Sequence, residues 1–375
     1  MMCLYGNIRK FRVSRIQFLI IFLLLNLVSC LPEGEYKAPV NYEPRERADG
    51  WEISDASSEG FNPGRLQEVY EMMFEDGKFL SSRSLLVVKN GRLVSESYFR
   101  DQNDIARKGN IKGITKCVTS VLTGFAWDQK LIDTETKLYA YIPGHFDGDR
   151  DKREITVEHV LTMRTGLEWD DRVNTRELFN INQFPNSVRV VLTKPLANTA
   201  GTEFLYNDGT PQLAMGLLSR VFNMDQTDSL VSKLFSPLGI TDFVWEQHAD
   251  GLHFGGTGLH LKPRDLALFG LFCLNRGLWE GWQVVSQDWI EIATHPFLDS
   301  QVTGLPYHYG YYWWIDPANN AYFGRGAGGQ YLYIVPSREL VIVHTAGSAS
   351  GPGSSELSTE EFLDLAGRII DALEK

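Results

Sequence analysis

Cysteine is scarce in this chain of 375 residues, which contains only four. Cys3 and Cys30 lie near the N-terminus, while Cys117 and Cys273 stand apart in apolar surroundings. No cysteine pair has the close spacing of a zinc site, and the eight histidines are scattered. Cysteines this few and this far apart exclude a disulfide framework. We therefore expect two buried thiols, no metal site and no cofactor.

Positive charge is also in short supply. The chain has 36 Lys and Arg residues against 47 Asp and Glu residues, a formal net charge of −11. A chain this acidic does not follow phosphate backbones, because like charges repel. Nucleic acid is therefore excluded as a partner.

An apolar run of about 20 residues, the length that spans a bilayer, is missing too. The short run Phe18–Leu25 follows four basic residues and precedes Leu27-Val28-Ser29-Cys30. This order is typical of a secretory signal. A cysteine at the cleavage point resembles a bacterial lipoprotein signal over residues 1–30, in which Cys30 is lipidated. The alternative is an ordinary signal with a chance cysteine.

The lipoprotein hypothesis implies a location. Cys30 would anchor the protein to a membrane of the bacterial cell envelope, and Leu31 after it fits sorting to the periplasmic face of the outer membrane. Residues 31–61 are rich in Pro, Glu, Gly and Ser without an apolar period, so we predict a flexible tether there.

The folded domain is predicted over residues 62–375. Asn62-Pro63 is typical of a helix start, and Leu85–Val88, Asn90-Gly91 and Leu93–Tyr98 predict a hairpin. Helical spacing dominates from about 113 to 254. Strands are expected around 309–315, 331–335 and 340–344, followed by a helix that Ser358 and Glu361 cap.

This order predicts an α+β fold, with an antiparallel sheet flanked by helices and an all-helical insertion. The α/β part comprises about 62–112 and 255–375, and the helical part about 113–254.

The chain also lacks a side-chain oxygen at position 113. Gly113-Ile114-Thr115-Lys116 has the layout of a catalytic helix start, with a lysine one turn after the nucleophile position. A serine there would attack a carbonyl, and a lysine of lowered pKa would take its proton. Glycine has no side-chain oxygen and cannot form an acyl-enzyme. We expect Thr115 and Cys117 to point elsewhere on the helix. Ser120 lies one turn deeper than Lys116, where we expect a buried core hydroxyl, so none of the three replaces the serine.

Further motifs follow in a fixed order. They are ITVEHVLTMRTGL (155–167), GTEFLYNDG (201–209), GLHLKPRDLA (258–267), YGYYWW (309–314) and GAGGQ (326–330). Together they resemble the serine β-lactamase and penicillin-binding-protein superfamily over residues 62–375, in particular its branch of class C-related esterases and aminohexanoate-oligomer hydrolases. That family's first motif is Ser-x-x-Lys, which here reads Gly-Ile-Thr-Lys. The resemblance implies a β-lactamase/transpeptidase-like fold.

The resemblance also implies roles for individual residues. Tyr206 matches the family's general acid/base beside Lys116, and Asp208 stands where the family has a neutral Ser or Asn. A carboxylate there would hold Lys116 as a cation and raise its pKa, which spoils the lysine as a base.

Two groups are expected to bind ligand. Arg325 lies where the family often has lysine or histidine, and its fixed charge suits a substrate carboxylate. The backbone of Gly326 to Gly328 would supply one oxyanion-hole N–H. Gly113 keeps the N–H of the other donor although it lacks the nucleophile.

Three hypotheses follow. The first is a lipid-anchored member of the hydrolase family, a pseudoenzyme that binds a small amide, ester or peptide-like ligand with its covalent chemistry lost or greatly reduced. The second is an active esterase or amidase that uses Lys116, Tyr206 and water or a shifted nucleophile. The third is a non-catalytic lipoprotein that binds a ligand or protein partner. We also expect Gly113→Ser to restore reaction with acylating probes without changing the fold.

Overall fold

The computed structural model describes residues 40–146, 148–175, 186–224, 227–347 and 356–374. The predicted signal over 1–30, Cys30 and residues 31–39 lie outside the described residues. Within the described ranges, no helix is both long and apolar enough to cross a membrane.

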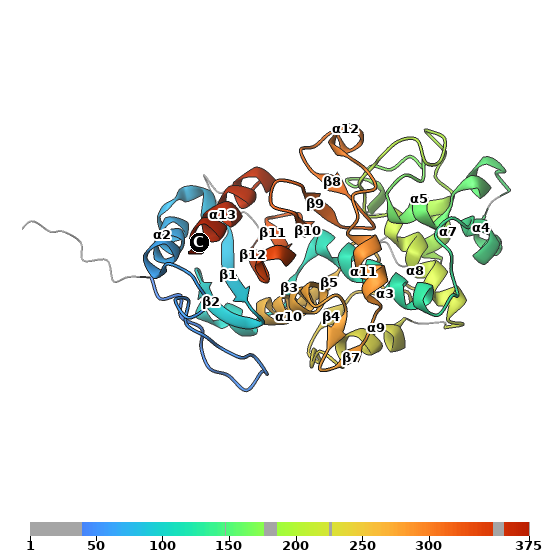
Figure 1. Cartoon of the computed structure of the whole chain (residues 1–375). Helices are drawn as coiled ribbons and strands as arrows, with labels where there is room; N and C mark the ends of the chain where they lie inside the picture. The colour runs from blue at the N-terminus through green and yellow to red at the C-terminus, as the bar shows by residue number, and fades with distance from the viewer. Residues whose placement is uncertain (1–39, 147, 176–185, 225–226, 348–355, 375) are drawn as a thin grey trace, which may run out of the picture. The chain divides into compact units, whose positions relative to one another are not determined.

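A seven-stranded antiparallel sheet forms the centre of the fold (Figure 1). Its strands, in spatial order, are β2 (Arg92–Tyr98), β1 (Ser82–Lys89), β12 (Leu340–Ala346), β11 (Gln330–Val335), β10 (Ala321–Gly326), β9 (Trp314–Asp316) and β8 (His308–Tyr309). β1 pairs with β12, so the first hairpin completes a sheet whose other strands come from the C-terminal third of the chain. Local sequence patterns therefore predict individual strands. They do not predict the order of the strands in the sheet, because β1 and β12 lie more than 200 residues apart.

Helices cover both faces of this sheet. α2 (Pro63–Glu75) and α13 (Thr359–Asp371) contact each other, and Phe362 of α13 stacks on Tyr331 of β11. The next residue of β11, Leu332, faces α10 (Pro263–Leu274), where Gly270 leaves no room for a side chain. Because successive strand residues point to opposite faces, the sheet is buried on both sides.

The second part of the fold is mainly helical. α3 (Thr115–Asp128) is its central helix, and twelve of its fourteen residues are buried. The other helices of this part are α4 (Leu138–Tyr141), α5 (Val157–Leu161), α7 (Ser187–Leu192), α8 (Thr210–Val221) and α9 (Asp228–Phe235). A small sheet of β3 (Gly109–Asn110), β5 (Leu259–Leu261) and β4 (Val244–Trp245) joins the two parts. The predicted α+β architecture is confirmed.

A short hairpin and two short α-helices follow α10 along the chain. They are the hairpin of β6 (Leu278–Trp279) and β7 (Trp282–Gln283), α11 (Gln287–Ala293) and α12 (Ser300–Thr303). α11 packs against α3, since Trp289 Nε1 donates a hydrogen bond to Ser120 O at 2.9 Å.

The prediction of a single strand around residues 309–315 is wrong. Residues 308–309 and 314–316 form two short strands joined by a turn in which Tyr312 has a φ of +68°. Gly310 packs against the backbone of Ala293, which leaves no room for a side chain there. The aromatic composition of residues 309–314 is typical of a strand. The chain turns there because the backbone at Ala293 packs against Gly310.

The described part of the predicted tether, residues 40–61, packs on the domain instead. Trp51 and Phe61 are buried, Ile53 pairs with Leu93, and the ring of Tyr42 stacks on Tyr70. The few large apolar residues in this polar segment find partners far away in sequence, which local composition does not reveal. The folded domain therefore begins before residue 62.

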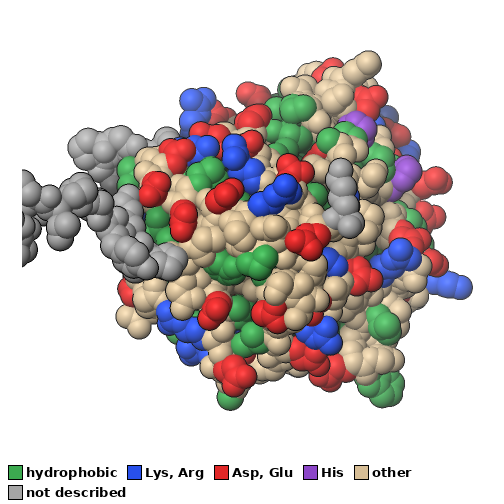
Figure 2. All heavy atoms as spheres, turned by 60° about the vertical axis from the view of Figure 1, so that its left-hand side comes forward, with side chains coloured by type: hydrophobic (Ala, Val, Ile, Leu, Met, Phe, Trp, Pro, Cys, Tyr) green, Lys and Arg blue, Asp and Glu red, His purple; other side chains and the backbone are tan. Residues whose placement is uncertain are grey.

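Charged side chains of both signs are interspersed on the face drawn in Figure 2, and the apolar side chains there form small groups. The face shows no continuous basic stripe of the kind that follows a phosphate backbone.

Candidate functional site

A cleft of about 460 Å³ lies where the start of α3, the segment before α8, the end of β10 and the start of α13 meet. Its walls include all seven residues that the sequence analysis assigns to catalysis or ligand binding. These are Gly113, Lys116, Tyr206, Asp208, Arg325, Gly326 and Gly328. The structure therefore brings together residues that lie up to 215 positions apart.

Glycines bring β10 close to the start of α3. A Cβ on Gly326 would lie 2.4 Å from Ile111 O and 3.0 Å from Gly113 N, and a Cβ on Gly324 would lie 2.8 Å from Cys117 Sγ. Side chains at either position would push strand and helix apart. The turn that holds Gly113 (Lys112–Ile114) therefore packs directly on the strand that bears Arg325.

Lys116 is held in an ion pair at the bottom of the cleft. Its side chain is 1% exposed, and Nζ lies 2.5 Å from Asp208 Oδ1. The same ammonium donates a second hydrogen bond to Gly256 O at 3.0 Å. It also lies 4.6 Å from the centre of the Tyr206 ring.

The surroundings decide the protonation state of Lys116. Burial alone would lower its pKa, but the carboxylate of Asp208, with a smaller contribution from Asp171, outweighs burial and raises the pKa. The lysine is therefore an ammonium at neutral pH. This agrees with the effect expected from an acidic residue at position 208.

The space beside Gly113 is filled. A Cβ there would lie 2.5 Å from Arg325 O, 2.7 Å from Tyr206 Oη and 3.5 Å from Lys116 Nζ. Cβ atoms almost never approach other heavy atoms closer than 3.0 Å, and moving a backbone carbonyl costs more than moving the end of a flexible side chain. Serine at 113 therefore requires a local shift of β10 or of the turn that holds residue 113. That the variant keeps the fold stays a prediction.

Tyr206 lies between the two cations of the inner cleft. Burial raises the pKa of its hydroxyl, while Lys116 and Arg325 act in the opposite direction without overcoming it. Its ring also packs at 5.2 Å from that of Trp314. Tyr206 therefore stays protonated, as a proton donor or hydrogen-bond partner.

Arg325 is fixed on an aromatic wall. Its guanidinium lies 4.6 Å from the Trp314 ring centre and 5.5 Å from that of Tyr206, and Nη1 donates to Thr359 Oγ1 at 3.1 Å. Within the described ranges, no carboxylate lies within ion-pair distance of this guanidinium. The cation is thus held in place with charge left for an anionic ligand.

The turn between β10 and β11 forms the rim of the cleft. Gly328 and Gly329 have φ angles of +87° and +89°, which glycine adopts readily. The N–H of Gly328 donates to Glu356 Oε2 at 3.2 Å. That donor is therefore engaged by a carboxylate, which the sequence analysis does not predict.

Other hydroxyl or thiol groups on α3 do not replace a serine. Cys117 is buried, its Sγ donates to Tyr312 O at 3.4 Å, and burial raises the pKa of its thiol. Thr115 and Ser120 are also fully buried. None of the three is among the described residues that line the cleft.

Sequence reasoning missed several lining residues, above all Asp171, Thr257, Glu356 and Thr359. Asp171 Oδ1 accepts hydrogen bonds from Asp208 N at 2.9 Å and Trp169 Nε1 at 2.8 Å. No spacing links Asp171 to Asp208, so only the folded chain shows that they are neighbours.

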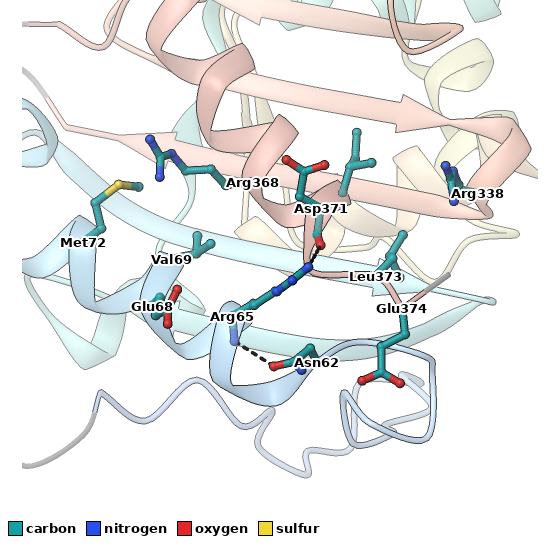
Figure 3. Close-up of a pocket in the computed structure, with 11 residues that line it drawn as sticks. Asn62, Arg65, Glu68, Val69, Met72, Arg338, Arg368, Asp371, Leu373 and Glu374 are labelled. Atoms are coloured by element: carbon teal, nitrogen blue, oxygen red, sulfur yellow. Dashed lines mark hydrogen bonds between the residues drawn. The ribbon is translucent and has the colours of Figure 1, made fainter.

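A larger hollow of about 970 Å³ lies between α2 and α13 (Figure 3). Arg65 crosses it and donates to Asp371 O at 3.0 Å, and its backbone N–H is capped by Asn62. The charged side chains of its wall are exposed and of both signs, so solvent screens them. No group of three or more potential metal ligands occurs in the described part of the chain either. The cleft is therefore the candidate site.

Comparison with known proteins adds family evidence to this geometry. A family model described as Beta-lactamase matches residues 80–360. A 6-aminohexanoate-dimer hydrolase of Paenarthrobacter ureafaciens is 22% identical over 286 residues, which are 69% of this chain and 71% of the relative.

Solved structures of several activities share the fold. A penicillin-binding protein homologue of Caulobacter crescentus has a TM-score of 0.66 at 15% identity, covering 83% of this chain and 97% of the other. A family VIII carboxylesterase also has a TM-score of 0.66 at 15% identity, with coverage of 84% and 98%. At such low identity these likenesses show the fold alone.

Proposed function

The chain belongs to the beta-lactamase family, and from that premise we propose that it binds a family-type ligand in its cleft while acyl transfer is lost or greatly reduced. The observation behind this proposal is Gly113 at the position of the family's nucleophilic serine. In a well-studied protease, loss of the nucleophile costs on the order of 10⁶ in turnover, and only binding and oxyanion stabilisation remain.

The ligand we propose is a short amide, ester or peptide with a carboxylate. Arg325 is the anchor for that carboxylate, because the aromatic wall fixes its guanidinium beside the cleft. The relative from Paenarthrobacter is named for a 6-aminohexanoate dimer, an amide that ends in a carboxylate. A ligand of this size suits a cleft of about 460 Å³.

Two measurements test this function. The purified protein should not react with a fluorophosphonate or penicillin probe, and rapid stoichiometric labelling would contradict the proposal. A 6-aminohexanoate dimer should bind in calorimetry, and Arg325→Ala should abolish binding. Arg325→Lys is the matched control, since it keeps the charge but loses the planar fork.

An active hydrolase is the second candidate, because Lys116 and Tyr206 both remain beside position 113. Water would attack directly in this case, without a covalent intermediate. The ion pair with Asp208 counts against Lys116 as the base. Steady turnover of short nitrophenyl esters that Tyr206→Phe or Lys116→Ala abolishes would favour this candidate. Rates unchanged from wild type in both variants would remove it.

We propose that Cys30 is lipidated and anchors the protein in the bacterial cell envelope. The motif Leu27-Val28-Ser29-Cys30 supports this. Metabolic labelling with a fatty acid should mark the wild type and not Cys30→Ser, and the variant should leave the membrane fraction. Labelling of both proteins would contradict lipidation at this cysteine.

A further inference from the structure

The two members of the Lys116–Asp208 ion pair differ in solvent exposure. The Lys116 side chain is 1% exposed, whereas that of Asp208 is 25% exposed. The ammonium has its two acceptors, Asp208 Oδ1 and Gly256 O, at 2.5 and 3.0 Å. A buried ammonium needs such partners, because an unpaired charge away from water is costly.

Asp208 is itself held in position by a chain of contacts. Its backbone N–H donates to Asp171 Oδ1 at 2.9 Å. Asp171 in turn accepts from Trp169 Nε1 at 2.8 Å and from Thr175 Oγ1 at 3.0 Å. These contacts fix the backbone of Asp208, from which its carboxylate reaches Lys116.

We propose that Asp208, positioned by Asp171, keeps Lys116 as a structural cation and is a second block to acyl transfer, independent of the missing serine. When a serine attacks a carbonyl, the new O–C bond forms as the hydroxyl proton leaves for a base. An ammonium has no free electron pair and cannot accept that proton. This inference deepens the proposed loss of chemistry and rests on it.

Charge around the pair supports the same assignment. Burial alone would lower the pKa of Lys116, and Asp208 is the largest of the contributions that raise it. Removal of the carboxylate leaves burial as the largest influence on Lys116, so we expect the pKa of the amine to fall. Asp171 contributes in the same direction at longer range.

Competitive acetylation measures this charge state without any need for a serine. A neutral amine attacks acetic anhydride, an N–C bond forms, acetate leaves and the proton goes to solvent; an ammonium does not react. Mass spectrometry would compare Lys116 with the exposed Lys130 at pH 8 in each protein. We expect Lys116 in Asp208→Asn to react at least about tenfold faster than in wild type, the ratio that one pKa unit produces.

Asp242→Asn is the matched control, because Asp242 pairs with Lys108 and Lys262 outside the cleft. It should leave Lys116 as unreactive as in wild type. Equal reactivity of Lys116 in wild type and Asp208→Asn would overturn the proposal. This contrast does not depend on whether the wild type hydrolyses anything, so its failure is distinct from a failure of the proposed function.

A second arm uses a restored nucleophile. Gly113→Ser alone should not react with a fluorophosphonate probe, whereas Gly113→Ser with Asp208→Asn should react. Labelling of the single variant as strong as that of the double variant would also overturn the proposal. Where serine disturbs the packing at Arg325 O, the acetylation contrast still decides the question.

Discussion

At Gly113, contacts with other elements restrict the size of the side chain more than the preferences of the local helical turn do. Glycine normally weakens a helical turn by up to about 1 kcal/mol relative to alanine. Here the carbonyl of Arg325 and the hydroxyl of Tyr206 occupy the place of a Cβ, at 2.5 and 2.7 Å. The contact with β10 therefore decides the residue at 113.

We predict that Gly113→Ala destabilises the protein by about 1–3 kcal/mol, the usual cost of overpacking, despite alanine's better helix propensity. Urea unfolding measures the free energy change. Gly367→Ala is the control, because nothing lies within 4 Å of a Cβ at that position of α13. It should be neutral or stabilising; a stabilising effect at both positions would show that the cleft has room at 113.

Contacts between elements hold the scaffold of the cleft together. Arg264 of α10 is buried, and its Nε donates to Glu96 Oε2 of β2 at 3.0 Å. Its Nη1 and Nη2 donate to Asp49 Oδ2 at 2.7 Å and Arg45 O at 2.6 Å. One guanidinium thus joins a helix, an edge strand and the N-terminal segment.

Arg264→Ala should lower the free energy of unfolding by about 3–5 kcal/mol, because the buried carboxylate of Glu96 loses its cationic partner. Arg368→Ala removes the Arg368–Asp364 pair, whose side chains are 54% and 52% exposed. That control should cost less than about 1 kcal/mol. Similar losses in the two variants, measured by urea unfolding, would contradict a central role for Arg264.

A second contact between elements gives a pH dependence. His344 of β12 hydrogen-bonds through its two ring nitrogens to Gly329 O at 2.7 Å and Ser82 Oγ at 2.8 Å. Burial lowers the pKa of His344 from 6.5 to about 4, against the smaller opposing effect of Gly329 O. Between about pH 6.5 and pH 4, His344 therefore binds a proton in the unfolded chain but stays neutral in the folded chain.

The contribution of His344 to stability is therefore complete above about pH 6.5 and is lost as the pH falls towards 4, a change of roughly 3 kcal/mol. Unfolding free energies at pH 7 and pH 5 should differ less in His344→Gln than in wild type. Some slope will remain, since burial also lowers the pKa of His253 to about 4. An unchanged slope in His344→Gln would contradict this assignment; the exposed His295→Gln controls for the substitution itself.

For the molecule as a whole, the N-terminal segment belongs to the fold. Trp51 and Phe61 lie in the core, and Asp49 is part of the Arg264 network. A chain that starts at residue 62 should be less stable by roughly 3–6 kcal/mol than one that starts at residue 40, because two large apolar side chains are lost. Thermal or urea unfolding of the two chains tests this; equal stability would restore the tether interpretation of residues 40–61.

Local signals in the sequence predict single elements well. Asn62 accepts from Arg65 N at the start of α2, Asn90-Gly91 forms the turn between β1 and β2, and Ser358 with Glu361 makes a capping box on α13. Each of these depends on residues within four positions of one another. The strand order and the packing of residues 40–61 depend on distant partners, so local patterns do not contain them.

The sequence by itself determined the family motifs, their order and the absence of a hydroxyl at position 113, because these are matters of residue identity. Only the tertiary structure decided that Asp208 touches Lys116, that Asp171 supports Asp208 and that Arg325 O lies against Gly113. These contacts join segments about 35 to 210 residues apart, and their distances follow from the packing of the sheet against the helices.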